Sequence, residues 1–408
     1  MSGRRISAVL AFCLIFAAWL SPTYQELTRL PGTLTLSVGD RLRMISSPGL
    51  TLEGSGHDGT GDVVVARRRA GWSAAGVRLW GGPVVKRIRV QTIPSRKVVL
   101  GGSSIGVVMP YGAPVVVGYA PLRERGLLFR SPAHDAGLKL GDRILKIGQE
   151  WVHADGDVAR AVDRAARLQR VVSVVVERGG QPLERRLDPV YDPRRGSWRI
   201  GLFVKDGVSG VGTLTFSVPR SRLWCALGHP VVGTPGGRAS RGGRILEADV
   251  LGLKAGRRGI PGEKIGLLDN DRPYLGRILE STPVGLVGRL FKEPRGRLVR
   301  LGTPDEVHPG PATIYTVLDG HRVENFRVEI ERKLPTSRPS AKAFTLRATD
   351  PELLRRAGGI VQGMSGSPIV QDGRLVGAIT HVFVNDPTRG FGVYALWMLN
   401  GAEHARRT

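Results

Sequence analysis

Short runs of alternating apolar and polar residues recur along most of the chain. Residues 33–38 (Thr-Leu-Thr-Leu-Ser-Val) and 86–90 (Lys-Arg-Ile-Arg-Val) alternate in this way, and a period of two turns one face of a strand toward a core. Gly and Pro interrupt the runs as turns between strands require. Residues 23–100 are therefore predicted to form a small β-rich region, and their spacing of His, Asp, Glu and Cys indicates no activity.

The first 22 residues follow another pattern. Arg4 and Arg5 precede fifteen mostly apolar residues, 6–20, and Ser21-Pro22 ends the run. A basic start before an apolar run is typical of an export signal or a short membrane anchor. The run is short for a membrane span, and no small-x-small cleavage site follows it. The sequence favours an anchor that leaves the remaining chain outside the cytoplasm.

Residues 101–190 combine strand-like runs with one amphipathic helix. The helix is predicted at 155–168, and strands at 171–176 and 183–187 flank Gly179-Gly180. Its apolar face holds Val158, Ala161, Val162 and Ala165. Residues 131–147 contain Pro-Ala, Ala-Gly-Leu and Gly-Asp-x-Ile in the order that resembles a PDZ domain.

The PDZ resemblance implies a unit that reads peptides. A strand edge beside a helix accepts a peptide as an added strand, and we expect the backbone amides of Ser104, Ile105 and Gly106 to receive it. This Ser-Ile-Gly-Val run departs from the Gly-Leu-Gly-Phe type of loop in that family. Binding of a C-terminus, of an internal strand or of its own chain stays open, as does a purely structural role.

A predicted linker at residues 191–199, which contains Pro193, Gly196 and three Arg, leads to the last domain at 200–402. Short strand patterns dominate there and helical signals are few, which predicts a mainly β, barrel-like domain. The whole chain of 408 residues is long enough for two or three domains.

The run Gly363-Met364-Ser365-Gly366-Ser367-Pro368 stands before a strand-like segment in this domain. Glycines beside a serine allow a substrate carbonyl to approach the backbone, so Ser365 is the candidate nucleophile. Ser367 is the rival, although Pro368 after it favours a turn residue. A plain turn between two strands is the alternative for the whole run.

Acyl transfer by serine also needs a base, an acid that orients the base, and donors for the oxyanion. His229, at the end of a predicted strand, is the candidate base. The backbone N–H groups of Gly363 and Ser365 are the candidate oxyanion donors. Other histidines with weaker contexts are His308, His321 and His381.

Asp350 is the candidate acid. The alternative is that it caps a short helix, because Pro351 follows it and Gly358-Gly359 ends the segment. Further candidates for the orienting group are Asp249, Asp269 and Asp319.

The two cysteines, Cys13 and Cys225, give no basis for an intramolecular disulfide. A Cys225–His229 thiol site is the alternative to a serine site, but four residues along a strand separate the side chains by about 13 Å. Cys225 is therefore interpreted as a small core residue.

Four motifs together resemble the SpoIVB family of sporulation serine peptidases. They are Leu-Gly-His at 227–229, Asp-Pro-Glu-Leu-Leu at 350–354, Gly-Gly-Ile-Val-Gln-Gly-Met-Ser-Gly-Ser-Pro at 358–368, and Thr-His-Val-Phe-Val-Asn-Asp-Pro at 380–387. The resemblance implies a chymotrypsin-like double β-barrel with Ser365 as nucleophile, His229 as base and Asp350 as acid. It implies no metal and no organic cofactor.

The resemblance also implies a biological role. Such a protein is exported into the space between the two membranes of a developing endospore, tethered there, and cuts itself and a membrane-anchored regulator, so that a late sigma factor becomes active. The resemblance implies that the PDZ unit controls this self-cleavage. This chain departs from the family pattern in its arginine content and in His229-Pro230-Val231, so no cleavage preference is carried over.

The formal net charge of +25 raises nucleic acid as a partner. However, the fifty Arg and ten Lys are spread along the chain without interleaved aromatic residues, so we expect no nucleic-acid binding. Two readings remain as alternatives to a peptidase: a PDZ-containing adaptor at the membrane that no longer cuts, and a basic scaffold.

Overall fold

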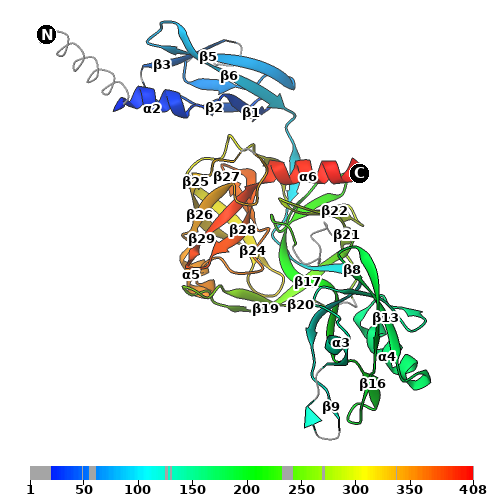
Figure 1. Cartoon of the computed structure of the whole chain (residues 1–408). Helices are drawn as coiled ribbons and strands as arrows, with labels where there is room; N and C mark the ends of the chain where they lie inside the picture. Colours follow the sequence, from blue (N-terminus) through cyan, green and yellow to red (C-terminus); the bar gives the residue numbers. More distant parts are fainter. Residues whose placement is uncertain are drawn as a thin grey trace, which may run out of the picture.

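The computed structural model describes residues 20–47, 49–54, 61–124, 127–128, 131–231, 242–268, 272–336 and 338–407. These residues form three bodies along the chain: an N-terminal β body, a central pair of barrels and a PDZ body (Figure 1). The apolar run at 6–20 lies outside the described residues except for Leu20. Within the described part, no helix is long and apolar enough to cross a membrane.

The N-terminal body has a four-stranded sheet in the order β1-β6-β5-β3, with β1 parallel to β6. Alternation along β6 buries Ile88 and Val90 beside Leu34 and Leu36 of β1. The elements are α2 (Pro22–Arg29), β1 (Thr33–Ser37), β2 (Arg41–Arg43), β3 (Leu50–Gly54), β4 (Val63–Val65), β5 (Gly71–Leu79) and β6 (Val84–Ile93).

The first barrel closes through the pairs β8-β17-β18-β22-β21-β19 and back to β8. Its core holds Ile105, Trp224 and Ile245. Strand β20 (Glu263–Leu268) extends it by pairing with β19. The bounds are β8 (Ser104–Tyr119), β17 (Leu202–Ser217), β18 (Leu223–Ala226), β19 (Arg244–Lys254), β21 (Gly276–Thr282) and β22 (Gly285–Leu290).

The second barrel closes through β24-β25-β26-β29-β28-β27 and back to β24. Phe344, Met364 and Ile369 lie in its core. The strands are β24 (Gly310–Val317), β25 (Val323–Lys333), β26 (Phe344–Ala348), β27 (Pro368–Gln371), β28 (Arg374–Phe383) and β29 (Asp386–Tyr394), and α5 (Pro351–Ala357) follows β26. The domain is thus a double β-barrel of the chymotrypsin type, as the sequence predicted.

Three elements join the two barrels. Strand β7 (Lys97–Leu100) pairs with β17 of the first barrel and with β23 (Leu298–Leu301), which pairs in turn with β28 of the second. Helix α6 (Ala395–Arg407) buries Met398 and Leu399 in a core shared by both barrels. The two barrels are therefore fixed to each other by strand pairing through β7 and β23 and by the packing of α6.

The PDZ body packs helix α4 against strands β11, β13 and β14. The predicted face of α4 is buried, with one difference: Ala166 is buried where Ala165 was expected. The elements are α3 (Pro132–Asp135), β11 (Arg143–Ile147), β12 (Glu150–Trp151), α4 (Asp155–Leu168), β13 (Val172–Arg178), β14 (Gln181–Leu187), β15 (Val190–Asp192) and β16 (Ser197–Arg199), with the short pair β9 (Arg123–Glu124) and β10 (Leu127–Leu128).

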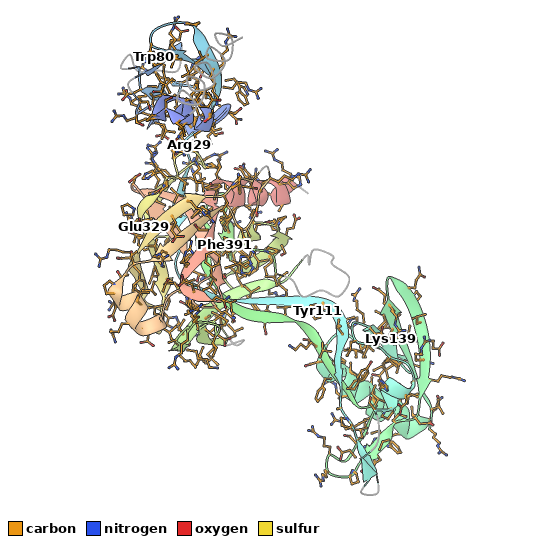
Figure 2. All side chains as sticks on the ribbon, turned by 60° about the vertical axis from the view of Figure 1, so that its left-hand side comes forward. Arg29, Trp80, Tyr111, Lys139, Glu329 and Phe391 are labelled. Atoms are coloured by element: carbon orange, nitrogen blue, oxygen red, sulfur yellow. The ribbon has the colours of Figure 1, made fainter. Side chains whose placement is uncertain are left out.

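Two long strands connect the PDZ body to the first barrel. Strands β8 and β17 pair from Ser104↔Thr213 in the barrel to Tyr119↔Leu202 in the PDZ body, and Figure 2 shows them as a cyan and a green ribbon that run together between the two. The first half of β8 therefore belongs to the barrel, although the sequence analysis placed it in the PDZ unit.

Candidate active site

The turn that carries Ser365 precedes β27 and is clamped to the first barrel. Thr213 of β17 donates its backbone N–H to the Ser365 carbonyl oxygen at 2.9 Å, and its hydroxyl donates to the Gly363 carbonyl oxygen at 2.9 Å. The hydroxyl of Thr215 donates to the Gly366 carbonyl oxygen at 2.8 Å. The nucleophile candidate of the second barrel is thus positioned by a strand of the first.

The glycine after Ser365 is required by this close approach. Gly366 has a φ of 93°, and a Cβ there would lie 2.1 Å from the Thr213 carbonyl oxygen. Any larger residue would have to push the turn away from β17. The Gly-x-Ser-Gly pattern read from the sequence therefore reflects packing between barrels as well as access for a substrate.

Ser365 and Ser367 differ in exposure. Ser365 is partly exposed, and its hydroxyl donates to the Thr380 carbonyl oxygen at 2.7 Å. Ser367 is fully buried, and its Oγ has no hydrogen-bond partner among the described residues. A substrate can meet only the first of these hydroxyls, so the geometry supports Ser365 over its rival.

The backbone N–H groups of the turn fall into two sets. Those of Met364, Gly366 and Ser367 donate to the carbonyls of Val361, Ile379 and Met364. Within the described part of the chain, those of Gly363 and Ser365 donate to no other group. Two unused donors that flank one peptide unit beside a serine hydroxyl are what an oxyanion site requires.

His229 follows β18 and reaches the turn from the first barrel. Gly228 before it packs on Thr380, because a Cβ there would lie 2.8 Å from Thr380 Cγ2. His229 Nδ1 lies 3.0 Å from the Pro230 carbonyl oxygen. A carbonyl only accepts, so we assign the proton to Nδ1, which leaves Nε2 of the neutral ring as a proton acceptor.

The His229 ring lies beside the ring of His381, with centroids 4.9 Å apart. Burial lowers the pKa of His229, and the hydrogen bond to Pro230 offsets part of this effect. Burial, His229 and Lys342 together lower the pKa of His381 to about 4. Both rings are therefore neutral near pH 7. His381 follows Thr380, whose carbonyl holds the Ser365 hydroxyl, so the three segments meet at one place.

The structure does not bring Asp350 to this place by any described contact. Its carboxylate caps α5, accepting from the N–H groups of Glu352 (3.0 Å) and Leu353 (3.3 Å), and its second oxygen accepts from Arg327 N (3.2 Å). Burial acts to raise the pKa of Asp350, but these hydrogen bonds outweigh it and lower the pKa.

No hydrogen bond or ion pair of the described residues joins Asp350 to His229, or His229 to Ser365. The carbonyl of Pro230 holds the His229 ring instead. Of the other candidates, Asp249 pairs with Arg272 and His321, and Asp269 lies outside the described residues. The observed cap is the alternative that Pro351 and Gly358 indicated.

Comparison with known families settles the class of this site. The family model described as SpoIVB peptidase S55 matches residues 196–399, half of the chain, and a PDZ domain model matches 125–188. The chain belongs to the SpoIVB peptidase S55 family. It is a serine peptidase with an internal PDZ domain, as its motifs indicated.

Other relatives of the S55 peptidase are distant. A putative zinc metalloprotease of Treponema pallidum is 36% identical over 73 residues, which are 18% of this chain and 16% of that protein, so the chain spans about a sixth of its length. The active form of the protease Rv3671c from M. tuberculosis has a TM-score of 0.32 at 13% identity, covering 62% of this chain and 88% of the other. The HtrA-type protease AlgW with a decapeptide has the same TM-score and identity, covering 53% and 58%.

The predicted peptide-binding residues of the S55 peptidase's PDZ domain need correction. Ser104, Ile105 and Gly106 are buried in the first barrel, where β8 is hydrogen-bonded to β17 on one edge and to β19 on the other. A strand paired on both edges has no free backbone groups for a peptide. The Gly-poor Ser-Ile-Gly-Val run departs from a PDZ loop because it is a barrel strand.

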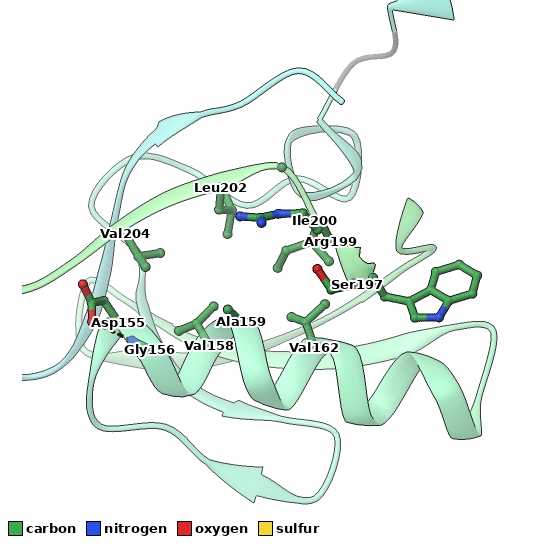
Figure 3. A pocket seen from close by; sticks show the side chains of 12 residues that line it. Asp155, Gly156, Val158, Ala159, Val162, Ser197, Arg199, Ile200, Leu202 and Val204 are labelled. Carbon is green, nitrogen blue, oxygen red and sulfur yellow. Dashed lines mark hydrogen bonds between the residues drawn. The ribbon is translucent and has the colours of Figure 1, made fainter. Parts of the chain in front are cut away.

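A groove with the right form lies instead between α4 and the start of β17 (Figure 3). It encloses about 270 Å³. The carbonyls of Ile200 and Gly201 accept hydrogen bonds from Ala133 N and Ala120 N. The N–H groups of Ile200 and Gly201 donate to nothing among the described residues. The walls of the groove include Val158, Ala159, Val162, Arg199, Leu202 and Val204.

The sequence contains a signal for this groove. Arg-Ile-Gly-Leu-Phe at 199–203 matches the apolar-Gly-apolar form of a PDZ loop better than the run at 104–107. Its glycine, Gly201, has a φ of 68° and packs against Ala120. This run lies at the C-terminal end of the PDZ body, next to the predicted linker, so the order of the motifs along the chain does not point to it.

Proposed function

We propose that the S55 peptidase cleaves peptide bonds with Ser365 as nucleophile, His229 as general base, and the N–H groups of Gly363 and Ser365 as oxyanion donors. The observation that carries this assignment is the turn itself: a partly exposed serine hydroxyl beside the two unused N–H groups. Mutation of an oxyanion donor typically costs about a hundredfold or more in rate, so such a pair is a large part of the catalytic apparatus.

The proposed reaction begins at the Ser365 hydroxyl. The Ser365 hydroxyl leaves the Thr380 carbonyl and gives its proton to His229 Nε2 while Oγ attacks the substrate carbonyl carbon. The resulting oxyanion accepts from Gly363 and Ser365. His229 then gives the proton to the leaving amine as the C–N bond breaks. In the second half, His229 takes a proton from a water molecule that attacks the acyl carbon, and gives it to Ser365 Oγ as the acyl C–O bond breaks. Base catalysis of this kind contributes about 10²- to 10⁴-fold.

The acidic partner is a separate question. The family resemblance assigns the role of the acid that orients His229 to Asp350. Asp350 could have this role only if its carboxylate left the α5 cap. In the described conformation, Pro230 fixes the His229 tautomer, which is one of the functions that an aspartate has in other serine peptidases.

For the biological role we propose an exported, membrane-tethered endopeptidase that cleaves itself and a membrane-anchored regulator in signalling between compartments during endospore formation, leading to sigma-factor activation. The family and the apolar run at 6–20 support this role. The site of action would be the space between the forespore and mother-cell membranes. A non-catalytic PDZ adaptor at the membrane is the alternative.

The PDZ groove is proposed to bind a peptide with a free C-terminus, including one from this chain. The unused N–H groups of Ile200 and Gly201 and the guanidinium of Arg199 favour a carboxylate. A fluorescent pentapeptide with a free carboxylate should bind more tightly than its C-terminal amide. Equal affinities would contradict carboxylate recognition.

Mass mapping of new N-termini tests the catalytic proposal. The wild-type chain and Ser365→Ala are incubated under the same conditions, and Ser367→Ala is the matched control from the same turn. We expect self-cleavage in the wild type and in Ser367→Ala, and none in Ser365→Ala. Equal processing by Ser365→Ala would overturn the assignment and favour the adaptor.

A further inference from the structure

Lys264 of β20 is a buried lysine that has no acidic partner among the described residues. Its side chain is 3% exposed. The amine donates to Thr316 Oγ1 of β24 at 2.8 Å and lies 3.5 Å from Ser104 Oγ of β8. In the described part of the chain it forms no ion pair. A buried ammonium without an anion is costly, so its retention requires a reason.

The same residue touches the oxyanion turn in two ways. Its backbone N–H donates to the Gln362 carbonyl oxygen at 2.9 Å. Its side chain lies under Gly363, because a Cβ there would be 3.0 Å from both Cβ and Cδ of Lys264. Lys264 therefore packs directly against Gly363, the first residue of the oxyanion turn.

Hydroxyl groups surround the amine from each barrel. Ser104 of β8 pairs directly with Thr213 of β17, and Thr213 holds the carbonyls of Gly363 and Ser365. Lys264, Ser104, Thr213 and Thr316 are all buried. They form a buried polar cluster that contacts the turn at Gly363 and at the Ser365 carbonyl.

Among the residues that the structure describes, no other ionisable group accounts for the pKa of this amine. Burial alone lowers the pKa of Lys264 to about 7. On the neighbouring strand β19, Glu247 and Asp249 pair with His321, and Glu263 on β20 is exposed. The groups that face the amine from β8 and β24 are the hydroxyls of Ser104 and Thr316. Both protonation states are therefore populated near neutral pH.

We propose that Lys264 is a positioning residue of the oxyanion site, which holds Gly363 in place and provides a positive charge behind the turn. The oxyanion that forms during acyl transfer would be the anion that the buried ammonium lacks in the resting protein. Interactions that exist only in the transition state accelerate the reaction rather than tighten substrate binding. This inference rests on the proposed function of Ser365.

A fluorophosphonate probe tests the inference without knowledge of the natural substrate, because its attack by a serine also places negative charge on an oxygen at the oxyanion site. The kinetics of labelling give a maximal rate and an apparent affinity. Lys264→Met keeps the length of the side chain and removes the charge. Lys254→Met, on the exposed side of the same hairpin, is the control.

For Lys264→Met we expect the maximal labelling rate to fall about tenfold or more, with an apparent affinity within about twofold of wild type. The advantage of the wild type should shrink as the pH rises through about 7, because the wild-type amine then loses its charge. Lys264→Arg, where it folds, should keep its rate at high pH. Lys254→Met should behave as wild type.

Unchanged labelling by folded Lys264→Met, or a loss that is the same at all pH values, would overturn the inference. If Lys264→Met does not fold, Lys264→Gln with a wild-type melting temperature replaces it. Failure of the proposed function looks different: the wild type would not be labelled at Ser365 at all.

Discussion

Thr213 and Ser365 belong to different barrels, and a hydrogen bond of 2.9 Å from the Thr213 backbone N–H to the Ser365 carbonyl oxygen joins them. Through its hydroxyl, Thr213 also holds Gly363. One residue of the first barrel thus fixes both ends of the peptide units that carry the nucleophile and the oxyanion donors.

The hydroxyl of Thr213 should therefore matter for both folding and activity. Thr213→Val keeps the shape of the side chain and removes the hydrogen bond to the Gly363 carbonyl. We expect unfolding to become easier by about 1 to 3 kcal/mol, and kcat to fall by about tenfold with KM nearly constant, because Gly363 loses its fixed orientation. Denaturant unfolding and steady-state kinetics measure the two effects. A change in KM alone, with kcat unchanged, would argue against this role.

Gly366 is predicted to be the least replaceable residue of the turn. A Cβ at this position would lie 2.1 Å from the Thr213 carbonyl oxygen and 2.5 Å from Leu227 N. We expect Gly366→Ala to lower the free energy of unfolding by at least 3 kcal/mol, since backbone would have to move on both sides. Thermal unfolding provides the measurement.

Gly210→Ala is the matched control for Gly366→Ala. Gly210 lies on β17, and a Cβ there would meet nothing within 4 Å. We expect its effect on stability to stay below about 1 kcal/mol. Similar losses for both variants would mean that the glycine acts through chain flexibility and not through contact with Thr213.

Local patterns predicted the strands, the PDZ helix and the nucleophile turn, because alternation, helical periodicity and paired glycines are properties of adjacent residues. They could not predict that β8 runs through two bodies. Ser104 and Tyr119 are the two ends of β8, the first in the barrel and the second in the PDZ body. Which edge of a strand is free depends on its pairing with strands that are distant in the sequence. That is why the peptide groove was placed at Ser104 instead of Ile200.

The site shows the same limit. Ser365 and His229 have informative neighbours in the sequence, whereas Lys264 stands in an ordinary strand pattern, and its burial under Gly363 depends on a contact across about a hundred residues. The local pattern around Asp350 fits both a catalytic acid and a helix cap. Only the positions of Arg327 and Leu353 showed which groups its carboxylate binds.

The activity of the peptidase should depend on pH through His229. Below its pKa the ring is protonated and cannot accept the Ser365 proton. Because burial lowers this pKa below its ordinary value near 6.5, we expect kcat/KM to be lost as the pH falls through a midpoint below 6.5. Initial rates between about pH 4.5 and 8 measure the midpoint.

His308 is the control for this pH dependence. It is exposed, pairs with Asp372 at 2.8 Å, and has a raised pKa through its hydrogen bond to Pro309 and this pair. His308→Gln should leave the acidic limb of kcat/KM unchanged. A limb that disappears in this variant, or a flat profile in the wild type, would exclude His229 as the base.

Two substitutions of Asp350 distinguish a structural role of this residue from a catalytic one. Asn retains an oxygen for the N–H groups of Glu352 and Leu353, but its NH₂ group cannot accept the Arg327 N–H that the second carboxylate oxygen accepts. We therefore expect Asp350→Asn to lose about 1 kcal/mol of stability and Asp350→Ala, which also loses the cap, about 2 kcal/mol. Because the carboxylate contacts the α5 cap and Arg327 and has no described contact with His229, we expect Asp350→Asn to keep kcat within about threefold. Thermal unfolding and initial rates on the same samples test this. A hundredfold loss of kcat in a fully folded Asp350→Asn would show instead that the carboxylate leaves the cap and orients His229 during catalysis, since an amide can cap a helix but cannot stabilise an imidazolium.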